Sequence, residues 1–248
     1  TDILGTMMMS VLAGHHRYAH ITTMRADTVN PPLLGMKKVA SEDSVRRAFQ
    51  NVDEDSARVW LQQHFKRCYE PLLFEPWILD MDTSVKPLYG HQAGAEVGYN
   101  PQKPGRPSHT FHTYFAANIR LVLDVEVAEG KKMASLYTRP GLWKLLESLP
   151  REAWPTFLRG DCAWGTEGAM SEAEAHGVKY LFKIKQSSNV KKLIQKLCRH
   201  ATWEPAGQDF SGAESALKLT GWSCERRVVV LRRRIRNGVM VEKKNSKG

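Results

Sequence analysis

Two apolar segments of this chain each run into aspartate, and they constrain its fold more than any other feature. The first is Trp-Ile-Leu-Asp-Met-Asp-Thr-Ser at 77–84, and the second is Phe-Leu-Arg-Gly-Asp-Cys at 157–162. Both are short and apolar enough to be strands, and a carboxylate at the end of a buried strand is costly unless it is paired or binds a metal. Two such strands predict a carboxylate pair that holds divalent cations, as in a metal-dependent enzyme.

The spacing of the first segment places its two carboxylates together. Side chains at i and i+2 of a strand share a face, so Asp80 and Asp82 point the same way and Leu79 and Met81 point into the packing. With Asp161 at the end of the second segment, they could hold Mg²⁺ ions (or Mn²⁺) roughly 3.5–4 Å apart, the two-metal arrangement of phosphoryl transfer. The alternative is that these aspartates only cap turns next to Thr83 and Gly160.

The charge distribution points to an anionic partner. The net charge is +10, and residues 179–248 hold 17 Lys or Arg against 5 Asp or Glu, whereas residues 1–178 hold 19 against 21. All of the basic excess therefore lies in the last part of the chain, which favours nucleic acid over a merely solvated surface. The four cysteines are scattered, which indicates neither a zinc site nor a disulfide framework. No apolar run has the length of a membrane span.

The chain divides by pattern into three regions, which we expect to be domains. Residues 1–72 read as helices and form a predicted DNA-binding region; a helix begins at Ser41, and a second spans about 53–69 with Val59, Leu61 and Phe65 on an inward stripe. The two helices fit a helix-turn-helix or a simple helical hairpin. Residues 73–200 predict the order β, β, β, α, β, α, β, α, with one of these helices at 140–149. That order fits a mixed α/β sheet with flanking helices. Residues 201–248 predict a basic, β-rich region with strands near 203–210, 217–222, 226–234 and 239–241.

Two groups of basic residues are candidates for DNA contacts. Arginines interleave with the apolar run 228–231, and arginine on a strand surface suits phosphate, although a solvated edge that discourages aggregation is the alternative. A second basic zone follows the strand near 180–185. The candidates are Arg226, Arg227, Arg232, Arg233, Arg234, Lys183, Lys185, Lys191 and Lys192.

Several motifs together resemble a known family. They are Leu-Asp-Met-Asp-Thr at 79–83, Leu-Tyr-Gly-His-Gln-Ala-Gly at 88–94, Gly-Tyr-Asn at 98–100 and Leu-Arg-Gly-Asp at 158–161, with Arg-Tyr-Ala-His at 17–20 and segments within 34–47. In these the chain resembles bacterial insertion-sequence transposases of the DDE class. The resemblance implies an RNase H-like catalytic domain and Mg²⁺-dependent cleavage and transfer of DNA strands by three carboxylates. It implies Asp82 as the first carboxylate, with Asp80 as an alternative or auxiliary ligand, and Asp161 as the second.

The third carboxylate of that pattern is a glutamate on a helix beyond a β-rich insertion, and no segment matches it. Glu225 and Glu242 lie on predicted strands beside basic residues, and we assign neither. We therefore expect a fragment that ends within a partial insertion. The alternatives are a catalytically inactive DNA-binding remnant and an RNase H-like nuclease. The expected partners are double-stranded DNA (transposon ends and target) and a second copy of the chain, in the bacterial cytoplasm and without a membrane.

Overall fold

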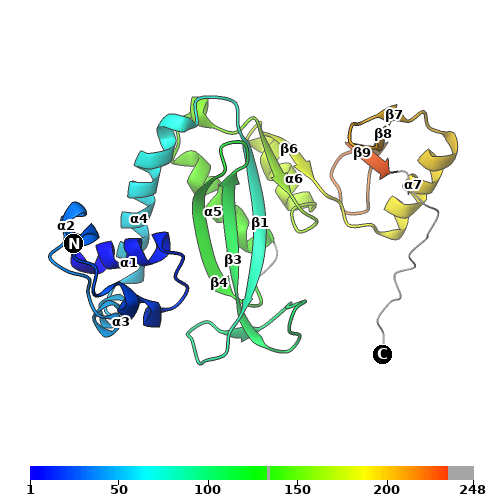
Figure 1. Ribbon diagram of the computed structural model, residues 1–248. Coiled ribbons are helices and arrows are strands. Elements are labelled where there is room, and N and C mark those ends of the chain that lie inside the picture. The colour runs from blue at the N-terminus through cyan, green and yellow to red at the C-terminus, as the bar shows by residue number, and fades with distance from the viewer. Residues whose placement is uncertain (133–134, 234–248) are drawn as a thin grey trace. The chain divides into compact units, whose positions relative to one another are not determined.

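A computed structural model describes residues 1–132 and 135–233 of the chain. The chain divides into two compact units, Thr1–Cys68 and Tyr69–Gly248, which are described separately here. Figure 1 follows the chain from the helical N-terminal unit to the sheets of the second unit. No helix in the described ranges is both long and apolar enough to cross a membrane.

The first unit is helical, as the sequence predicts. Its elements are α1 (Asp2–Leu12), the 3-10 helix η1 (Tyr18–Met24), α2 (Asn30–Leu33), α3 (Glu42–Gln50) and α4 (Glu54–Tyr69). The Ser41 hydroxyl accepts a hydrogen bond from the Ser44 amide at 3.2 Å, so Ser41 caps α3 at the predicted start. The small core comes from α1, η1, α3 and the segment before α3, with the side chains Met9, Ile21, Met36, Val39, Ala40 and Val45.

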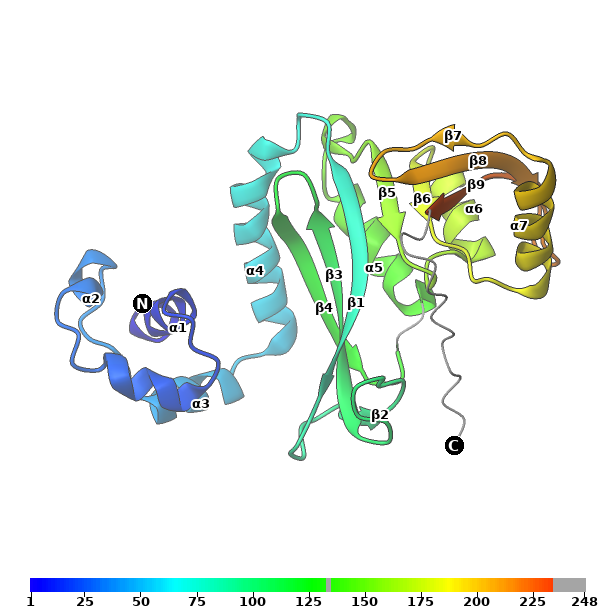
Figure 2. The same cartoon turned by 45° about the vertical axis from the view of Figure 1, so that its right-hand side comes forward.

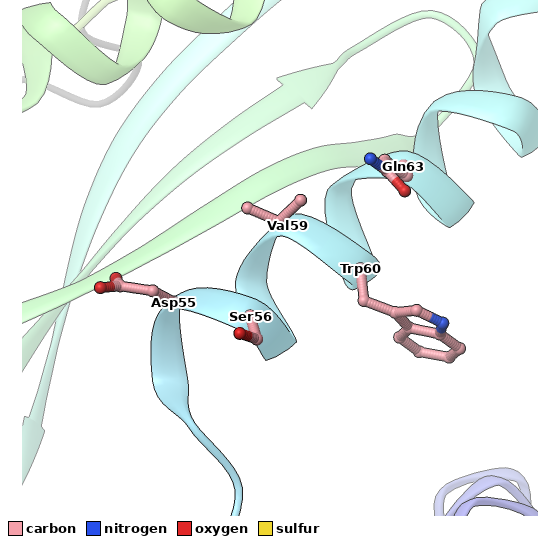
Figure 3. Close-up of a pocket in the computed structure, with 5 residues that line it drawn as sticks. All are labelled: Asp55, Ser56, Val59, Trp60 and Gln63. Carbon is pink, nitrogen blue, oxygen red and sulfur yellow. The ribbon is translucent and has the colours of Figure 1, made fainter.

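The inward stripe expected on α4 is wrong. Val59 is 52% exposed and Phe65 is 49% exposed, and α4 contributes nothing to the core of its unit. Val59, Trp60 and Leu61 are consecutive, and residues one apart on a helix do not share a face. Figure 3 shows Val59 and Trp60 projecting from α4 along an open pocket that Asp55, Ser56 and Gln63 also line.

The second unit is built on a mixed sheet. The strands β1 (Ile78–Pro87), β3 (Pro107–Ala116) and β4 (Leu121–Glu129) form an antiparallel meander, and β5 (Phe157–Gly160) and β6 (Lys179–Phe182) add parallel to β1. The order is β4-β3-β1-β5-β6, and the short β2 (Glu96–Val97) pairs with the start of β3. This is a mixed sheet whose strand order agrees with the one that the sequence predicts (Figure 2).

One face of the sheet forms the main core. On β3 every second side chain is buried, Tyr114 among them, and on β1 the buried side chains are Leu79 and Met81. These pack with side chains of α5 (Ser135–Glu147) and α6 (Glu167–Ala175). The expected start of α5 at Pro140 is wrong, because Pro140 lies inside a helix that already covers Ser135. Proline suits a helix start, so the sequence pattern placed the boundary too late.

The last described part forms a separate three-stranded sheet. Helix α7 (Ser188–His200) leads to β7 (Glu204–Pro205), β8 (Phe210–Leu217) and β9 (Arg226–Arg233), which are antiparallel in that order. The strand expected at 217–222 is therefore wrong. Only Leu217 belongs to a strand, and residues 218–222 form a connection in which Gly221 has a positive φ of 88°, a conformation that glycine adopts readily. The strand expected at 239–241 lies outside the described residues. Two 3-10 turns, η2 (Glu70–Leu72) and η3 (Arg151–Ala153), complete the unit.

Candidate active site

Asp82 and Asp161 occupy corresponding positions on neighbouring strands. The parallel pairing of β1 and β5 ends at Met81 opposite Gly160, so Asp82 and Asp161 are the next residue on each strand. Neighbouring strands lie roughly 4.8 Å apart. Both aspartates are exposed. The two residues that the sequence singles out are thus brought to one place on the sheet.

The first strand does not end at Asp82, contrary to the sequence expectation. It continues to Pro87, because β1 pairs with β3 as far as Ser108. What ends near Asp82 is the parallel partner β5, which is only four residues long. Asp82 therefore lies where the neighbouring strand β5 ends, and not at the end of its own strand β1.

Each of the two carboxylates accepts a hydrogen bond from a nearby backbone amide with one of its oxygens. Asp82 Oδ1 accepts the Thr83 amide at 2.9 Å, and Asp161 Oδ1 accepts the Ala163 amide at 2.8 Å. These are the turn-type contacts of the alternative interpretation. They leave Oδ2 of each residue without a hydrogen bond among the described residues. A local backbone contact and a free oxygen on each side chain are compatible with metal binding.

Asp80 has a different environment. Arg159 donates from Nε and Nη2 to the two carboxylate oxygens of Asp80 at 2.5 Å each, and the two residues are register partners on β1 and β5. The hydrogen bonds that Arg159 donates to Asp80 raise the pKa of the Arg159 guanidinium above its usual range. Both oxygens of Asp80 are therefore engaged in a bidentate ion pair.

A buried histidine that is not among the predicted site residues lies on β3 opposite Thr83, the residue after Asp82. His112 is 2% exposed; its Nδ1 is 3.0 Å from Thr83 Oγ1, and its Nε2 is 3.4 Å from Thr110 Oγ1. Burial lowers the pKa of His112, which favours the neutral ring. The signal in the sequence is the alternation of β3, which puts His112 on the same face as Tyr114. His112 thus holds the Thr83 side chain, one residue from Asp82.

The described residues contain no group of three His, Cys, Asp or Glu side chains that could hold a metal ion. Glu225 is exposed in the connection before β9, not on a strand, and Glu242 lies outside the described residues. The donor set at the site is therefore two carboxylates. Hard oxygen ligands of this kind suit Mg²⁺ or Mn²⁺, and Mg²⁺ sites often use only one or two carboxylates.

The first residue of the second basic zone, Lys183, lies beside Asp161 in the sheet register. Gly160 pairs with Phe182, so Lys183 follows β6 beside Asp161, and the Lys183 amide donates to the Gly160 carbonyl at 3.1 Å. Lys183 and Lys185 are exposed, as are Lys191 and Lys192 on α7. Positive charge therefore adjoins the carboxylate pair.

On β9 the predicted DNA-binding arginines have two kinds of surroundings. Arg232 lies over the Trp203 ring at 3.9 Å and Arg233 over the Phe210 ring at 5.6 Å, and both are exposed. Arg227 is also exposed but is paired with Glu214. Arg234 lies outside the described residues.

Arg226 is an internal side chain. It is 7% exposed and donates to Glu167 and Glu174 of α6, with the shortest contacts at 2.6 Å. The hydrogen bonds from Arg226, followed by those from Ser223, lower the pKa of Glu167 to about 2. The network joins β9 to α6, the helix that begins six residues after Asp161. The DNA contact expected of Arg226 stays a prediction, and its donors are used within the chain.

Comparison with solved structures finds transposases. The piggyBac transposase synaptic complex with hairpin DNA is 11% identical, with a TM-score of 0.42, over 97% of this chain and 52% of that chain. The chain thus spans about half the length of that relative. The Mos1 mariner paired-end complex with Mn is 10% identical, with a TM-score of 0.29, over 79% of this chain and 70% of that chain. No curated protein is significantly similar to the chain.

Family membership rests on the sequence rather than on these distant structures. The sequence model of the family described as "Transposase DDE domain group 1" matches residues 1–242. That match covers both aspartates, the mixed sheet and the second sheet. The chain belongs to the transposase DDE domain family, group 1.

Proposed function

We propose that this chain performs metal-dependent cleavage and transfer of DNA strands at the ends of an insertion sequence. The observation that carries the proposal is the placement of Asp82 and Asp161 side by side where the β1–β5 pairing ends. Family membership gives the reaction class. In this proposal the substrates are double-stranded transposon ends and target DNA. A homodimer of the chain binds them in the bacterial cytoplasm.

In this proposal Asp82 and Asp161 hold Mg²⁺ or Mn²⁺ through their free oxygens. Such ions activate an attacking water or hydroxyl and stabilise the leaving oxygen of a phosphodiester. Asp80 is an auxiliary residue, because Arg159 engages both of its oxygens. Thr83, held by His112, fixes the local backbone of Asp82. The third carboxylate of the reaction is not among these residues.

DNA is bound in this proposal by the helical region 1–72 and by the basic surface of the second unit. Lys183 lies beside Asp161 in the sheet register, and exposed lysines follow it on α7. Arg232 and Arg233 add charge and aromatic contacts on the second sheet. Arg226 and Arg227 serve mainly to hold that sheet, through Glu167, Glu174 and Glu214.

The test is cleavage of a duplex that carries the ends of the DNA element encoding the chain, in Mg²⁺ or Mn²⁺. We expect Asp82→Asn and Asp161→Asn to lower the cleavage rate at least about 10³-fold and to remove metal binding measured by calorimetry. Glu152→Gln, an exposed carboxylate on η3, is the matched control and should cleave normally. Normal cleavage by either aspartate variant would refute the site.

A second candidate is a DNA-binding protein without catalysis. The observation that favours it is that the described residues hold no three-residue metal group. It predicts salt-sensitive DNA binding with no strand cleavage in either metal. Cleavage without any joined product would instead indicate an RNase H-like nuclease.

A further inference from the structure

Three side chains form a cluster on the connection between β1 and β3, away from the aspartates. Arg106 Cζ lies 4.4 Å and Lys103 Nζ 4.9 Å from the centroid of the Tyr89 ring. The Lys103 ammonium also donates to the Tyr89 hydroxyl. Tyr89 is nevertheless 67% exposed. One open aromatic ring is therefore flanked by two cations.

The backbone holds this cluster in place. Asn100 Oδ1 accepts the Lys103 amide at 3.0 Å, and the Lys103 carbonyl accepts the Arg106 amide at 3.2 Å. The Leu88 amide donates to the Pro107 carbonyl at 2.9 Å, and Arg106 Nη1 donates to the Leu88 carbonyl at 3.4 Å. Tyr89 and the two cations are thus brought together before any ligand arrives, which lowers the entropy cost of binding.

The cluster carries positive charge that no carboxylate balances. The only acid within 88–106 is Glu96, and it pairs with Lys131 at 3.5 Å. No ion pair to Lys103 or Arg106 occurs among the described residues. The Lys103 hydrogen bond lowers the pKa of the Tyr89 hydroxyl, as expected beside unbalanced positive charge. An anion between the two cations would relieve their mutual repulsion.

A purely structural role fits less well. Cation–π pairs at exposed sites stabilise a fold only weakly, and the connection is already closed by backbone hydrogen bonds. Tyr99, on the same connection, is also open, at 68% exposed. An open ring with two donors has the composition of a contact to a nucleic-acid backbone.

We propose that Tyr89, Lys103 and Arg106 form a contact for a backbone phosphate of double-stranded DNA. The proposal rests on the proposed function for its ligand. Asp82 to Pro87 spans five residues of β1, or roughly 17 Å, which equals about five base-pair steps of duplex. The contact is therefore separate from the carboxylate pair, and Figure 2 shows the connection extending beyond the sheet next to β2.

The experiment compares DNA affinity at several salt concentrations for the full chain and the double variant Lys103→Gln/Arg106→Gln. We expect the variant to bind a duplex roughly tenfold more weakly near 0.1 M salt, with a slope of log affinity against log salt reduced by about 1. Tyr89→Leu keeps the charge and removes the ring, and we expect about threefold weaker binding. Circular dichroism confirms that each variant is folded.

The control is Arg120→Gln/Lys179→Gln, which removes the same charge from the β3–β4 turn and from the start of β6. An equal loss in the control would overturn the proposal, because it would show a general charge effect. Unchanged affinity in the Lys103/Arg106 variant would also overturn it, while cleavage by the wild-type chain would leave the proposed function intact. DNA binding without cleavage, with the expected loss in the variant, would support the contact and refute the catalytic function.

Discussion

Asp80 and Arg159 face each other across β1 and β5 and form an ion pair in which both carboxylate oxygens accept hydrogen bonds. Within residues 1–132 and 135–233, Asp82, two residues further on the same face, has no such partner. The spacing in the sequence puts Asp80 and Asp82 on the same face, and only the family resemblance ranks Asp82 first and Asp80 as the alternative or auxiliary ligand. The arginine on the neighbouring strand makes them unequal, because a bidentate guanidinium competes with a metal ion for the same oxygens.

Asp80→Asn should therefore affect metal binding much less than Asp82→Asn. We expect less than about tenfold loss of Mg²⁺ affinity for Asp80→Asn, and a loss of unfolding free energy of about 1 kcal/mol or less, because Arg159 is 47% exposed. Calorimetric titration with Mg²⁺ measures the first quantity and urea unfolding the second. If Asp80→Asn abolished metal binding and Asp82→Asn did not, the two roles would have to be exchanged.

Arg226→Ala should destabilise the protein strongly, and Arg227→Ala should not. Removing Arg226 leaves Glu167 and Glu174 without their shared cation, and loss of one partner of a buried pair costs about 3 kcal/mol. Arg227 is 72% exposed and pairs with Glu214, so its loss should cost less than about 1 kcal/mol. Urea unfolding of both variants checks the difference. Equal costs would show that the Arg226 network does not stabilise the docking of β9 on α6.

Stability should fall as the pH drops below about 6.5, because of His112. Burial lowers the pKa of His112 in the folded state, so on acidification the unfolded chain binds the proton first. The contribution of His112 to the stability is therefore complete above the unfolded-state pKa and is lost as the pH falls below it. The slope from this one group is at most about 1.4 kcal/mol per pH unit. Melting temperatures at pH 7.5 and 5.5 should differ less in His112→Gln than in the wild type. His91→Gln, an exposed histidine, should keep the wild-type difference.

Gly160→Ala should destabilise the second unit. A Cβ at Gly160 would lie 2.7 Å from Trp164 Cβ and Cγ, whose indole is only 3% exposed and cannot move freely. Overpacking of this kind costs about 1–3 kcal/mol. Gly212→Ala is the control, because its Cβ would meet Leu231 at an ordinary 3.4 Å. Thermal unfolding of the two variants should separate them, and equal melting temperatures would show that Trp164 yields to the extra methyl group.

The strand and helix order of the mixed sheet was predictable because its signals are local. The alternation in β3 and the apolar run before Asp161 need no knowledge of partners. The end of β1 was not predictable, since it depends on pairing with β3 as far as Ser108. The exposure of Val59 and Phe65 on α4 was also not predictable. An apolar pattern on a helix does not show whether another element packs against those side chains.

The sequence by itself determined the mixed-sheet class and the family, and it singled out Asp82 and Asp161 as candidate site residues. These follow from residue type, spacing and motif, which are properties of short segments. Only the tertiary structure decided that Arg159 pairs with Asp80 and that Arg226 lies inside an ion-pair network. The same holds for Lys103 and Arg106, which flank Tyr89. The partners in these contacts lie up to 79 residues apart in the chain, and pairings of that kind are set by strand register and packing rather than by local sequence.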